Sequence, residues 1–281
     1  MSTRNKTVRV AGSSLRFVVL TVGAIVMILP FAYMVSTAFK PQAYVLETPP
    51  KFIPDPGTID NFVQAWTTQD FSRYVLNSAF VSVTSTALAV WLSSMMAYAF
   101  ARFDFPGKEW FFRALLLGLM IPSMMLIIPQ FVLTKQLHLI DNLWALVLFY
   151  VSGNLALNTF LLRSFFEGIP RELDEAMEVD GANVWTRYWR LAMPLARPAL
   201  ATTVIFTFLA SWDEFAWALT VISTETKRTL PIAIQLFHGQ NSTQWGLVFA
   251  ASLIAILPVI VVYLVFQRHF VAGLTAGAVK G

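Results

Sequence analysis

Two adjacent carboxylates, Asp213 and Glu214, interrupt a long apolar run directly after Trp212. If this run crosses a membrane, a charge near its middle costs at least about 2.5 kcal/mol, and such acids usually serve a transport path or a proton relay. Carboxylates beside an indole ring also suit the hydroxyls and ring faces of sugars. Neighbours on a helix lie roughly 100° apart around its axis, so the two acids would not face each other as a catalytic pair. The structural alternative is that Glu214 extends toward the membrane surface or pairs with a neighbouring helix.

Five single polar residues in other apolar runs are weaker candidates for the same path: Asn77, Ser78, Ser82, Gln130 and Asn158. Single Ser and Asn side chains in membranes more often form hydrogen bonds between helices. The sequence has no cysteine and three widely separated histidines, so we expect no disulfide, no thiolate site and no metal site.

The elements that position these residues follow from the composition. The chain is 57% hydrophobic and only 13% charged, about half the charged fraction of ordinary soluble domains. Six apolar runs are each long enough for a helix to cross about 30 Å of hydrocarbon: residues 17–39, 74–101, 110–133, 143–162, 199–222 and 246–266. The runs are continuous rather than alternating, which excludes a β-barrel. The sequence therefore predicts an all-α membrane protein, with six transmembrane helices in a single domain over residues 1–281.

The basic residues predict the orientation of these helices. If the N-terminus is cytoplasmic, 14 of the 20 basic residues lie in cytoplasmic segments, as the positive-inside rule expects. Both termini and residues 163–198 are then cytoplasmic, and the loop 223–245 is external. The first run is too long for a signal peptide, so we expect a retained helix. The net charge of +4 reflects this topology and does not indicate nucleic-acid binding.

Residues 163–198, here called the polar interlude, form the long cytoplasmic connection between the fourth and fifth runs. The segment 171–179 is predicted to be a helix that begins after Pro170 and ends at Gly181, and Asn183 can cap a second helix. The second helix is amphipathic, with an apolar face formed by Trp185, Tyr188, Trp189 and Ala192. Two short helices of this kind would make a compact knob that docks on a partner. The alternative is an amphipathic helix that rests on lipid headgroups.

The polar interlude contains the pattern Glu175-Ala176-Met177-x-x-Asp180-Gly181-Ala182, followed by Met193-Pro194-Leu195 and Pro198. This pattern resembles the EAA loop of permease subunits of ATP-binding-cassette (ABC) importers, although Met177 stands where the family usually has alanine. Further stretches resemble carbohydrate permeases related to the maltose transporter: Leu76-Asn77-Ser78, Ser211-Trp212-Asp213-Glu214-Phe215 and the ending Phe270-Val271-Ala272-Gly273-Leu274-Thr275-Ala276-Gly277-Ala278-Val279-Lys280-Gly281. Asp213 stands where that branch commonly has asparagine.

The resemblance implies a six-helix permease subunit in the cytoplasmic (inner) membrane of a prokaryote, in contact with lipid. It also implies a second, different permease subunit, two ATPase subunits that bind ATP and Mg²⁺, and an external solute-binding protein. This chain would itself bind no cofactor. The sequence contains no Gly-x-x-x-x-Gly-Lys-Ser/Thr phosphate loop, so we expect a transport subunit and not an enzyme that hydrolyses ATP.

The resemblance also assigns roles to residues. The residues expected to couple to the ATPase are Glu175, Ala176, Met177, Asp180, Gly181, Ala182, Trp185 and Pro194. The residues expected on the substrate path are Trp212, Asp213, Glu214, Asn77, Ser78 and Asn158. The residues expected to contact the binding protein are Gln240, Asn241, Ser242 and Thr243, for which a solvated turn is the alternative.

The functional hypothesis is therefore a permease subunit of a binding-protein-dependent carbohydrate importer. One alternative is a secondary transporter that uses Asp213 or Glu214 as a proton relay. A second alternative, an intramembrane enzyme, requires a nucleophile and a base at matching depth, which the placement of these two acids does not supply.

Overall fold

Apolar runs form helices along nearly all of the chain in the computed structural model, which describes residues 3–67, 70–239 and 243–278, with side chains described between 16 and 267. Among these residues the β pairing amounts to one isolated bridge, between His238 and Thr243. The prediction of an all-α protein is confirmed. The chain divides into unit 1, residues 1–69 and 234–254, and unit 2, residues 70–233 and 255–281.

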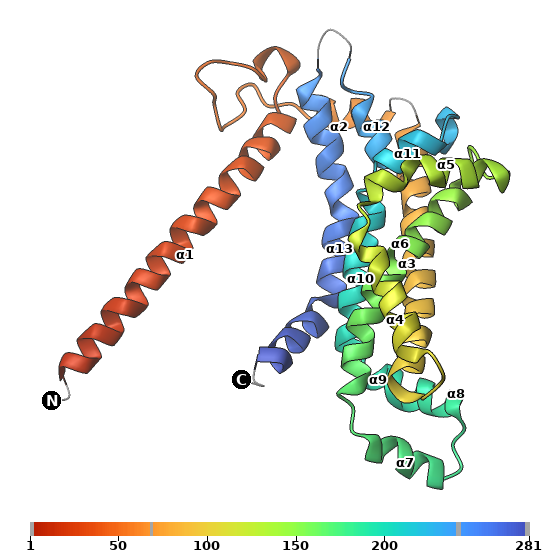
Figure 1. The fold of residues 1–281 in the computed structure, drawn as a ribbon. Helices are drawn as coiled ribbons and strands as arrows, with labels where there is room; N and C mark the ends of the chain where they lie inside the picture. Colours follow the sequence, from red (N-terminus) through yellow and green to blue (C-terminus); the bar gives the residue numbers. More distant parts are fainter. Residues whose placement is uncertain (1–2, 68–69, 240–242, 279–281) are drawn as a thin grey trace. The chain divides into compact units, whose positions relative to one another are not determined.

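Three long helices form the centre of unit 2: α3 (Phe71–Arg102), α6 (Leu143–Glu167) and α10 (Arg197–Trp212). They run side by side, and α3 packs along both of the others (Figure 1). Small side chains at spacings of three and four residues let α3 approach its neighbours closely. These buried side chains are Ser78, Ser82, Ser85, Ala89, Ser93 and Ala97.

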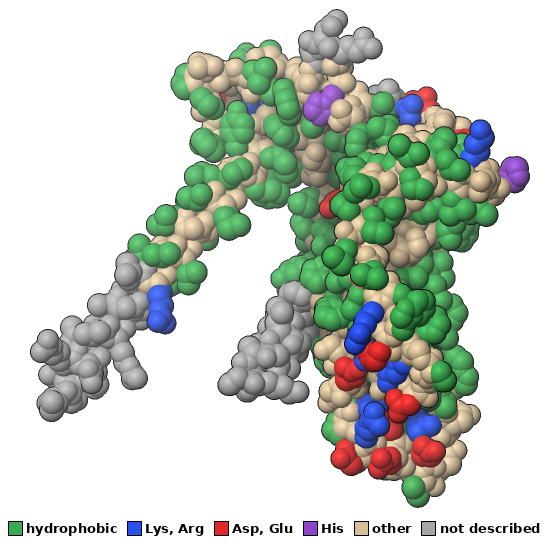
Figure 2. All heavy atoms as spheres, viewed as in Figure 1, with side chains coloured by type: hydrophobic (Ala, Val, Ile, Leu, Met, Phe, Trp, Pro, Cys, Tyr) green, Lys and Arg blue, Asp and Glu red, His purple; other side chains and the backbone are tan. Residues whose placement is uncertain are grey.

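The two ends of this bundle carry different segments. At one end lie α7 (Arg171–Val179) and α8 (Val184–Arg187), which belong to the polar interlude. At the opposite end lie α5 (Ile127–Gln136), α11 (Ala216–Val221) and α12 (Leu230–Gln235) (Figure 1). Charged side chains gather at the α7 end, whereas the flank of the bundle is mostly hydrophobic (Figure 2).

Buried apolar side chains form a core near each end of the bundle. One cluster joins α3 and α6 to α11 and includes Leu146, Tyr150 and Trp217. The other joins α3 and α6 to the polar interlude and includes Leu162, Phe166 and Tyr188. The polar interlude and the segment after α10 are therefore packed parts of the bundle.

Four helices in the described part of the chain are long and apolar enough to cross a membrane: the segment Arg16–Ala38 of α1 (Thr3–Ala38), then α3, α6, and the segment Trp245–Gln267 of α13 (Trp245–Ala278). Two bent pairs of helices raise the number to six if each pair is one span. The pairs are Lys108–Met120 with Ser123–Gln136, bent by 95°, and Val184–Leu195 with Arg197–Trp212, bent by 78°.

The third apolar run, expected as one helix over residues 110–133, is broken at Pro122. The first part contains α4 (Lys108–Leu117), and the second contains α5. Ile121 is extended, with φ −90° and ψ 117°. A residue before proline is sterically pushed out of the helical region, and proline lacks the N–H that the next helical hydrogen bond needs. The expectation of a continuous helix here was wrong.

The fifth run, expected as one helix over residues 199–222, is also broken. Helix α10 ends at Trp212, residues 213–215 are not helical, and α11 begins at Ala216. The expectation that Asp213 and Glu214 are neighbours on one helix was therefore wrong.

Unit 1 contains α1, the short helix α2 (Asp60–Thr67) and the first turns of α13. The buried Asn61 amide connects them, because it donates to the carbonyls of Ala38 at 2.9 Å and Lys40 at 2.7 Å. A Cβ at Gly246 would lie 2.8 Å from this amide, so only glycine fits beside Asn61 without a shift.

Candidate functional site

The first arm of the polar interlude is helix α7, which covers the residues predicted from the sequence. Pro170 precedes it, and Glu172 and Asp174 lie in its first turn, where the helix dipole favours acids. The helix closes at Gly181, whose φ is +80°. The N–H of Gly181 donates to the carbonyl of Glu178 at 2.9 Å. Glycine adopts this left-handed conformation without strain, so Gly181 sets the turn between the two arms.

The predicted coupling residues lie on the surface of this turn and its flanks. Six are exposed: Glu175, Ala176, Asp180, Gly181, Trp185 and Pro194. The other two, Met177 and Ala182, are half-buried. Val179, which the sequence analysis did not single out, is an exposed apolar residue at the end of α7. The arrangement presents acidic and apolar side chains together on one accessible turn.

In the second arm, only half of the predicted apolar face is buried. Tyr188 and Ala192 are buried at 2% exposure, whereas Trp185 and Trp189 are 58% and 50% exposed. The predicted face thus divides into two rows four residues apart, Trp185 with Trp189 exposed and Tyr188 with Ala192 buried, and Tyr188–Ala192 form a π-helical turn. The Tyr188 hydroxyl lies 2.6 Å from the Ser94 hydroxyl of α3. The second arm is therefore attached to the bundle through Tyr188.

Arg102, the last residue of α3, holds the first arm, and the sequence analysis did not identify it. Its Nε lies 3.1 Å from Oδ2 of Asp174, and its Nη2 donates to the carbonyl of Ile169 at 2.9 Å. The two charged side chains are only 7% and 13% exposed. A hollow of about 290 Å³ beside this pair is also lined by Arg187, which forms a 2.6 Å ion pair with Glu178 across the two arms.

Glu214 lies in the break between α10 and α11 and is held by three donors. Its Oε2 accepts from the Tyr150 hydroxyl at 2.6 Å and from the N–H of Ala218 at 3.0 Å. Its Oε1 accepts from the N–H of Trp217 at 2.7 Å. Glu214 thus caps the start of α11 and joins it to α6, as the structural alternative expected.

A cavity of about 300 Å³ opens beside Glu214. Its lining combines aromatic rings, amides and this carboxylate, and includes Gln130, Phe149, Tyr150, Asn154, Glu214 and Trp217. Sequence reasoning named Glu214 and, as a weaker candidate, Gln130 in this set. The other residues named here come from α6 and α11, and no spacing in the sequence relates them.

Trp212, Asp213 and Asn158 do not line this cavity. Trp212 is buried, stacks on Phe208 and donates to the carbonyl of Ala255 at 3.1 Å. Asp213 is exposed at the end of α10. The buried Asn158 amide donates to the Thr207 hydroxyl at 2.8 Å and so joins α6 to α10.

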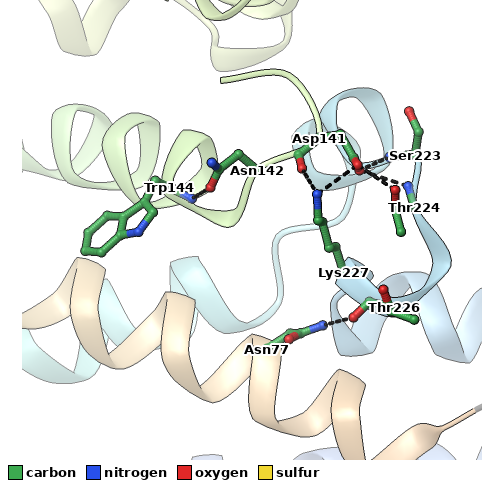
Figure 3. Close-up of polar contacts among 8 residues, drawn as sticks. All are labelled: Asn77, Asp141, Asn142, Trp144, Ser223, Thr224, Thr226 and Lys227. Atoms are coloured by element: carbon green, nitrogen blue, oxygen red, sulfur yellow. Dashed lines mark hydrogen bonds and ion pairs between the residues drawn. The ribbon is translucent and has the colours of Figure 1, made fainter. Parts of the chain in front are cut away.

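Asn77 and Ser78 bind the loop that follows α11. The Asn77 amide donates to the carbonyl of Thr226 at 3.0 Å (Figure 3). It also donates to the carbonyl of Arg228 at 2.9 Å. The Ser78 hydroxyl accepts from the N–H of Leu230 at 2.8 Å. The same loop is therefore held at three backbone positions by one turn of α3.

Asp141, in the connection between α5 and α6, holds the same loop from the other side and was not identified from the sequence. Its carboxylate accepts from the N–H groups of Ser223 at 2.9 Å and Thr224 at 2.8 Å, and from Lys227 Nζ at 3.0 Å (Figure 3). Burial alone would raise the pKa of Asp141, but these bonds and one from the Thr224 hydroxyl lower it well below the ordinary value of 3.8.

Of the four residues expected to contact a binding protein, Gln240, Asn241 and Ser242 lie outside the described residues. Thr243 is described, and its hydroxyl lies 3.3 Å from Nδ1 of His238. Its carbonyl accepts from the Gln42 amide at 3.2 Å. No group of three His, Asp or Glu side chains that could hold a metal ion occurs within the described residues.

Residues 89–275 match the family described as the binding-protein-dependent transport system inner membrane component. The chain belongs to this family. A permease protein of the sulfoquinovosyl glycerol transport system, SmoH of Agrobacterium fabrum, is 34% identical over 96% of this chain and 95% of its own length. SugB of Mycobacterium tuberculosis, a trehalose transport system permease protein, is 36% identical over 90% of this chain and 93% of its own.

A solved structure shares the fold of this permease. It is a bacterial ABC transporter involved in the import of alginate, and the match has a TM-score of 0.80 at 24% identity over 96% of this chain and 99% of that chain. The predicted resemblance to ABC permeases is confirmed, and the chain is a multi-pass inner membrane permease. The roles of single residues, the orientation of the termini and the single-domain assignment stay predictions.

Proposed function

We propose that this permease is one of two different permease subunits of an ABC importer that takes up a carbohydrate. An external solute-binding protein delivers the sugar, and two separate ATPase subunits bind ATP and Mg²⁺ and drive transport. The family match supports the assignment to a binding-protein-dependent transporter. The carbohydrate is supported by relatives whose names specify trehalose, diacetylchitobiose and arabinooligosaccharides.

The polar interlude supports the coupling role. Its turn exposes Glu175, Asp180 and Trp185, while Arg102 and Tyr188 attach its two arms to the bundle. A surface that is exposed at its tip and braced at its base can take up a force from a docked partner and pass it on. Fourteen of the 20 Lys and Arg residues fall in the segments on the same side as the interlude, which favours a cytoplasmic position for it, where the ATPases are.

The cavity beside Glu214 supports a place on the sugar path. Ligand sites in proteins usually have volumes of roughly 300–1,000 Å³, and this cavity of about 300 Å³ suits one sugar ring. Phe149 and Trp217 offer apolar ring surfaces, and Asn154 and Glu214 offer groups that can bond hydroxyls. We assign the path role to Glu214, because Asp213 and Trp212 do not line the cavity.

In this mechanism ATP binding closes the ATPases, the polar interlude moves with them, and the helices switch between inward-facing and outward-facing states. Such a switch is a rigid-body change between discrete packings. The sugar then meets Glu214 as a neutral ligand, and no covalent chemistry takes place on this chain.

The first prediction tests the coupling role. In the reconstituted complex, Glu175→Lys or Gly181→Asp should reduce both uptake and ATPase stimulation by the loaded binding protein about tenfold or more, the effect of losing about 1.4 kcal/mol of docking free energy. Glu175→Lys reverses a charge on the exposed turn, and Gly181→Asp adds a side chain at a φ of +80°.

Asp104→Lys is the matched control, because Asp104 is an exposed acid, 85% accessible, outside the polar interlude. It should leave both activities near the wild-type level. Normal uptake and stimulation in Glu175→Lys and in Gly181→Asp would refute the coupling role.

A further inference from the structure

Helix α3 contacts both the polar interlude and the loop of residues 222–230, which lie at opposite ends of unit 2. Its 32 residues correspond to about 48 Å at a rise of about 1.5 Å per residue. The helix contains neither glycine nor proline, the usual causes of kinks. In contrast, the third apolar run is bent by 95° between its two helical parts. Helix α3 can therefore move as one rigid element.

At the interlude end, α3 is attached to both arms. Arg102 binds the first arm through Asp174 and through the carbonyl of Ile169. Tyr98 packs edge-on against Tyr188 of the second arm, with ring centroids 5.3 Å apart. The buried Arg102 side chain forms one hydrogen bond, to the Ile169 carbonyl, and an ion pair with Asp174 that lacks hydrogen-bond geometry, so a shift of the first arm has to displace Arg102.

At the opposite end, the loop 222–230 is attached to α3 by its backbone. Asn77 donates to two of its carbonyls, and Ser78 accepts from the N–H of Leu230. Backbone contacts hold the path of the loop whatever its side chains do. Any displacement of the first turns of α3 is therefore passed to the loop directly.

We propose that Arg102 and Asn77 are positioning residues that tie the polar interlude and the loop 222–230 to the two ends of α3, so that a movement of the interlude displaces the loop. This inference rests on the proposed function, because the movement originates in the ATPases. It adds a mechanical link between the ATP-driven side of the permease and a loop on its external side.

A label on the loop tests the link. The chain has no cysteine, so Thr226→Cys introduces a single thiol at an exposed side chain. In a complex with cysteine-free partners, a spin label at this position should report a change in mobility or distance when a non-hydrolysable ATP analogue binds. Substitutions along a coupling network change coupling roughly two- to thirtyfold. Arg102→Met and Asn77→Ala should reduce the response of the label within that range, and Arg102→Lys should restore part of it.

Lys108→Met is the matched control, because Lys108 is a basic residue at the same end of the bundle that pairs with Asp104 outside the interlude. It should leave the response unchanged. Asp174→Asn keeps the shape of the side chain and removes its charge, and it should reproduce the loss even if Arg102→Met fails to assemble.

The outcomes separate this link from the proposed function. If the wild-type complex transports sugar with ATP but the label does not respond to nucleotide, the link is refuted. A wild-type response in Arg102→Met or Asp174→Asn would also refute it, while the proposed function would stand. A wild-type complex whose ATPase is not stimulated by the binding protein would instead refute the proposed function.

Discussion

At the scale of single residues, the acidic pair that the sequence singled out has two different environments. Glu214 is fixed by Tyr150 and two backbone N–H groups at the edge of a cavity. Asp213 is exposed one residue earlier. Glu214 therefore lines the cavity, where it can meet a substrate, whereas its neighbour Asp213 does not.

This difference predicts distinct phenotypes for two conservative substitutions. Glu214→Gln removes the charge that would accept bonds from sugar hydroxyls, and hydrogen bonds to charged groups contribute about 1.5–3 kcal/mol. We expect sugar uptake at low substrate concentration to fall about tenfold or more, with ATPase stimulation by the binding protein retained. The measurement is the ratio of sugar transported to ATP hydrolysed.

Asp213→Asn is the control at the neighbouring position, and it should leave that ratio unchanged. If Glu214→Gln transports normally, or if both substitutions lower the ratio equally, Glu214 has only its structural role as the cap of α11.

At the scale of elements, hydrogen bonds to backbone groups hold the segments that connect the helices. Asp141 reaches the loop 222–230 from the connection between α5 and α6, and Asn77 reaches it from α3. The donors around Asp141 stabilise its charged carboxylate. Protonation of this group would weaken the bonds, so the attachment of the loop depends on pH.

The direction of this pH dependence follows from the lowered pKa of Asp141. A carboxyl with a lower pKa in the folded state adds stability that is complete above its ordinary value of 3.8 and is lost as the pH falls through the native value. We expect hydrogen-exchange protection of residues 223–229 to persist from pH 7 to about pH 4 and to decline at lower pH. Asp141→Asn should reduce protection already at pH 7, by about 1–3 kcal/mol of local opening free energy.

Asp104→Asn changes an exposed acid at the other end of unit 2 and should leave the protection of this loop unchanged. Wild-type protection in Asp141→Asn at pH 7 would show that other contacts hold the loop.

At the scale of the whole molecule, charged side chains are concentrated at the ends of an apolar bundle (Figure 2). In unit 2, charged side chains gather around α7 and α8, and the flank is hydrophobic (Figure 2). A hydrophobic flank suits contact with lipid, as expected of a multi-pass membrane permease. The proposed function draws the energy for transport from separate ATPase subunits, and the alternative draws it from an ion gradient.

These two energy sources give opposite results in proteoliposomes. We expect uptake to require ATP inside, both permeases and the binding protein, and to persist when an uncoupler abolishes the proton gradient. Liposomes that contain this chain alone should show no uptake above background, a difference measured with radiolabelled sugar. Uptake that collapses with the uncoupler and continues without ATP would instead support a secondary transporter.

The sequence by itself determined the features that depend on neighbouring residues. Apolar runs of sufficient length predicted the helical membrane protein, because a helix satisfies its backbone hydrogen bonds within itself. Pro170 and Gly181 predicted the bounds of α7 for the same local reason. The motif around Glu175 identified the family.

The tertiary structure decided where distant residues meet. Arg102 and Asp174 are 72 positions apart, and Tyr150 and Glu214 are 64 apart, so no local periodicity relates them. The π turn at Tyr188 and the break after Trp212 likewise depend on packing and on bonds from other helices. Helical spans follow from local hydrogen bonding and hydrophobicity. The cavity, and the contacts of Asn77 and Arg102 at the two ends of α3, form only once separate helices have packed together.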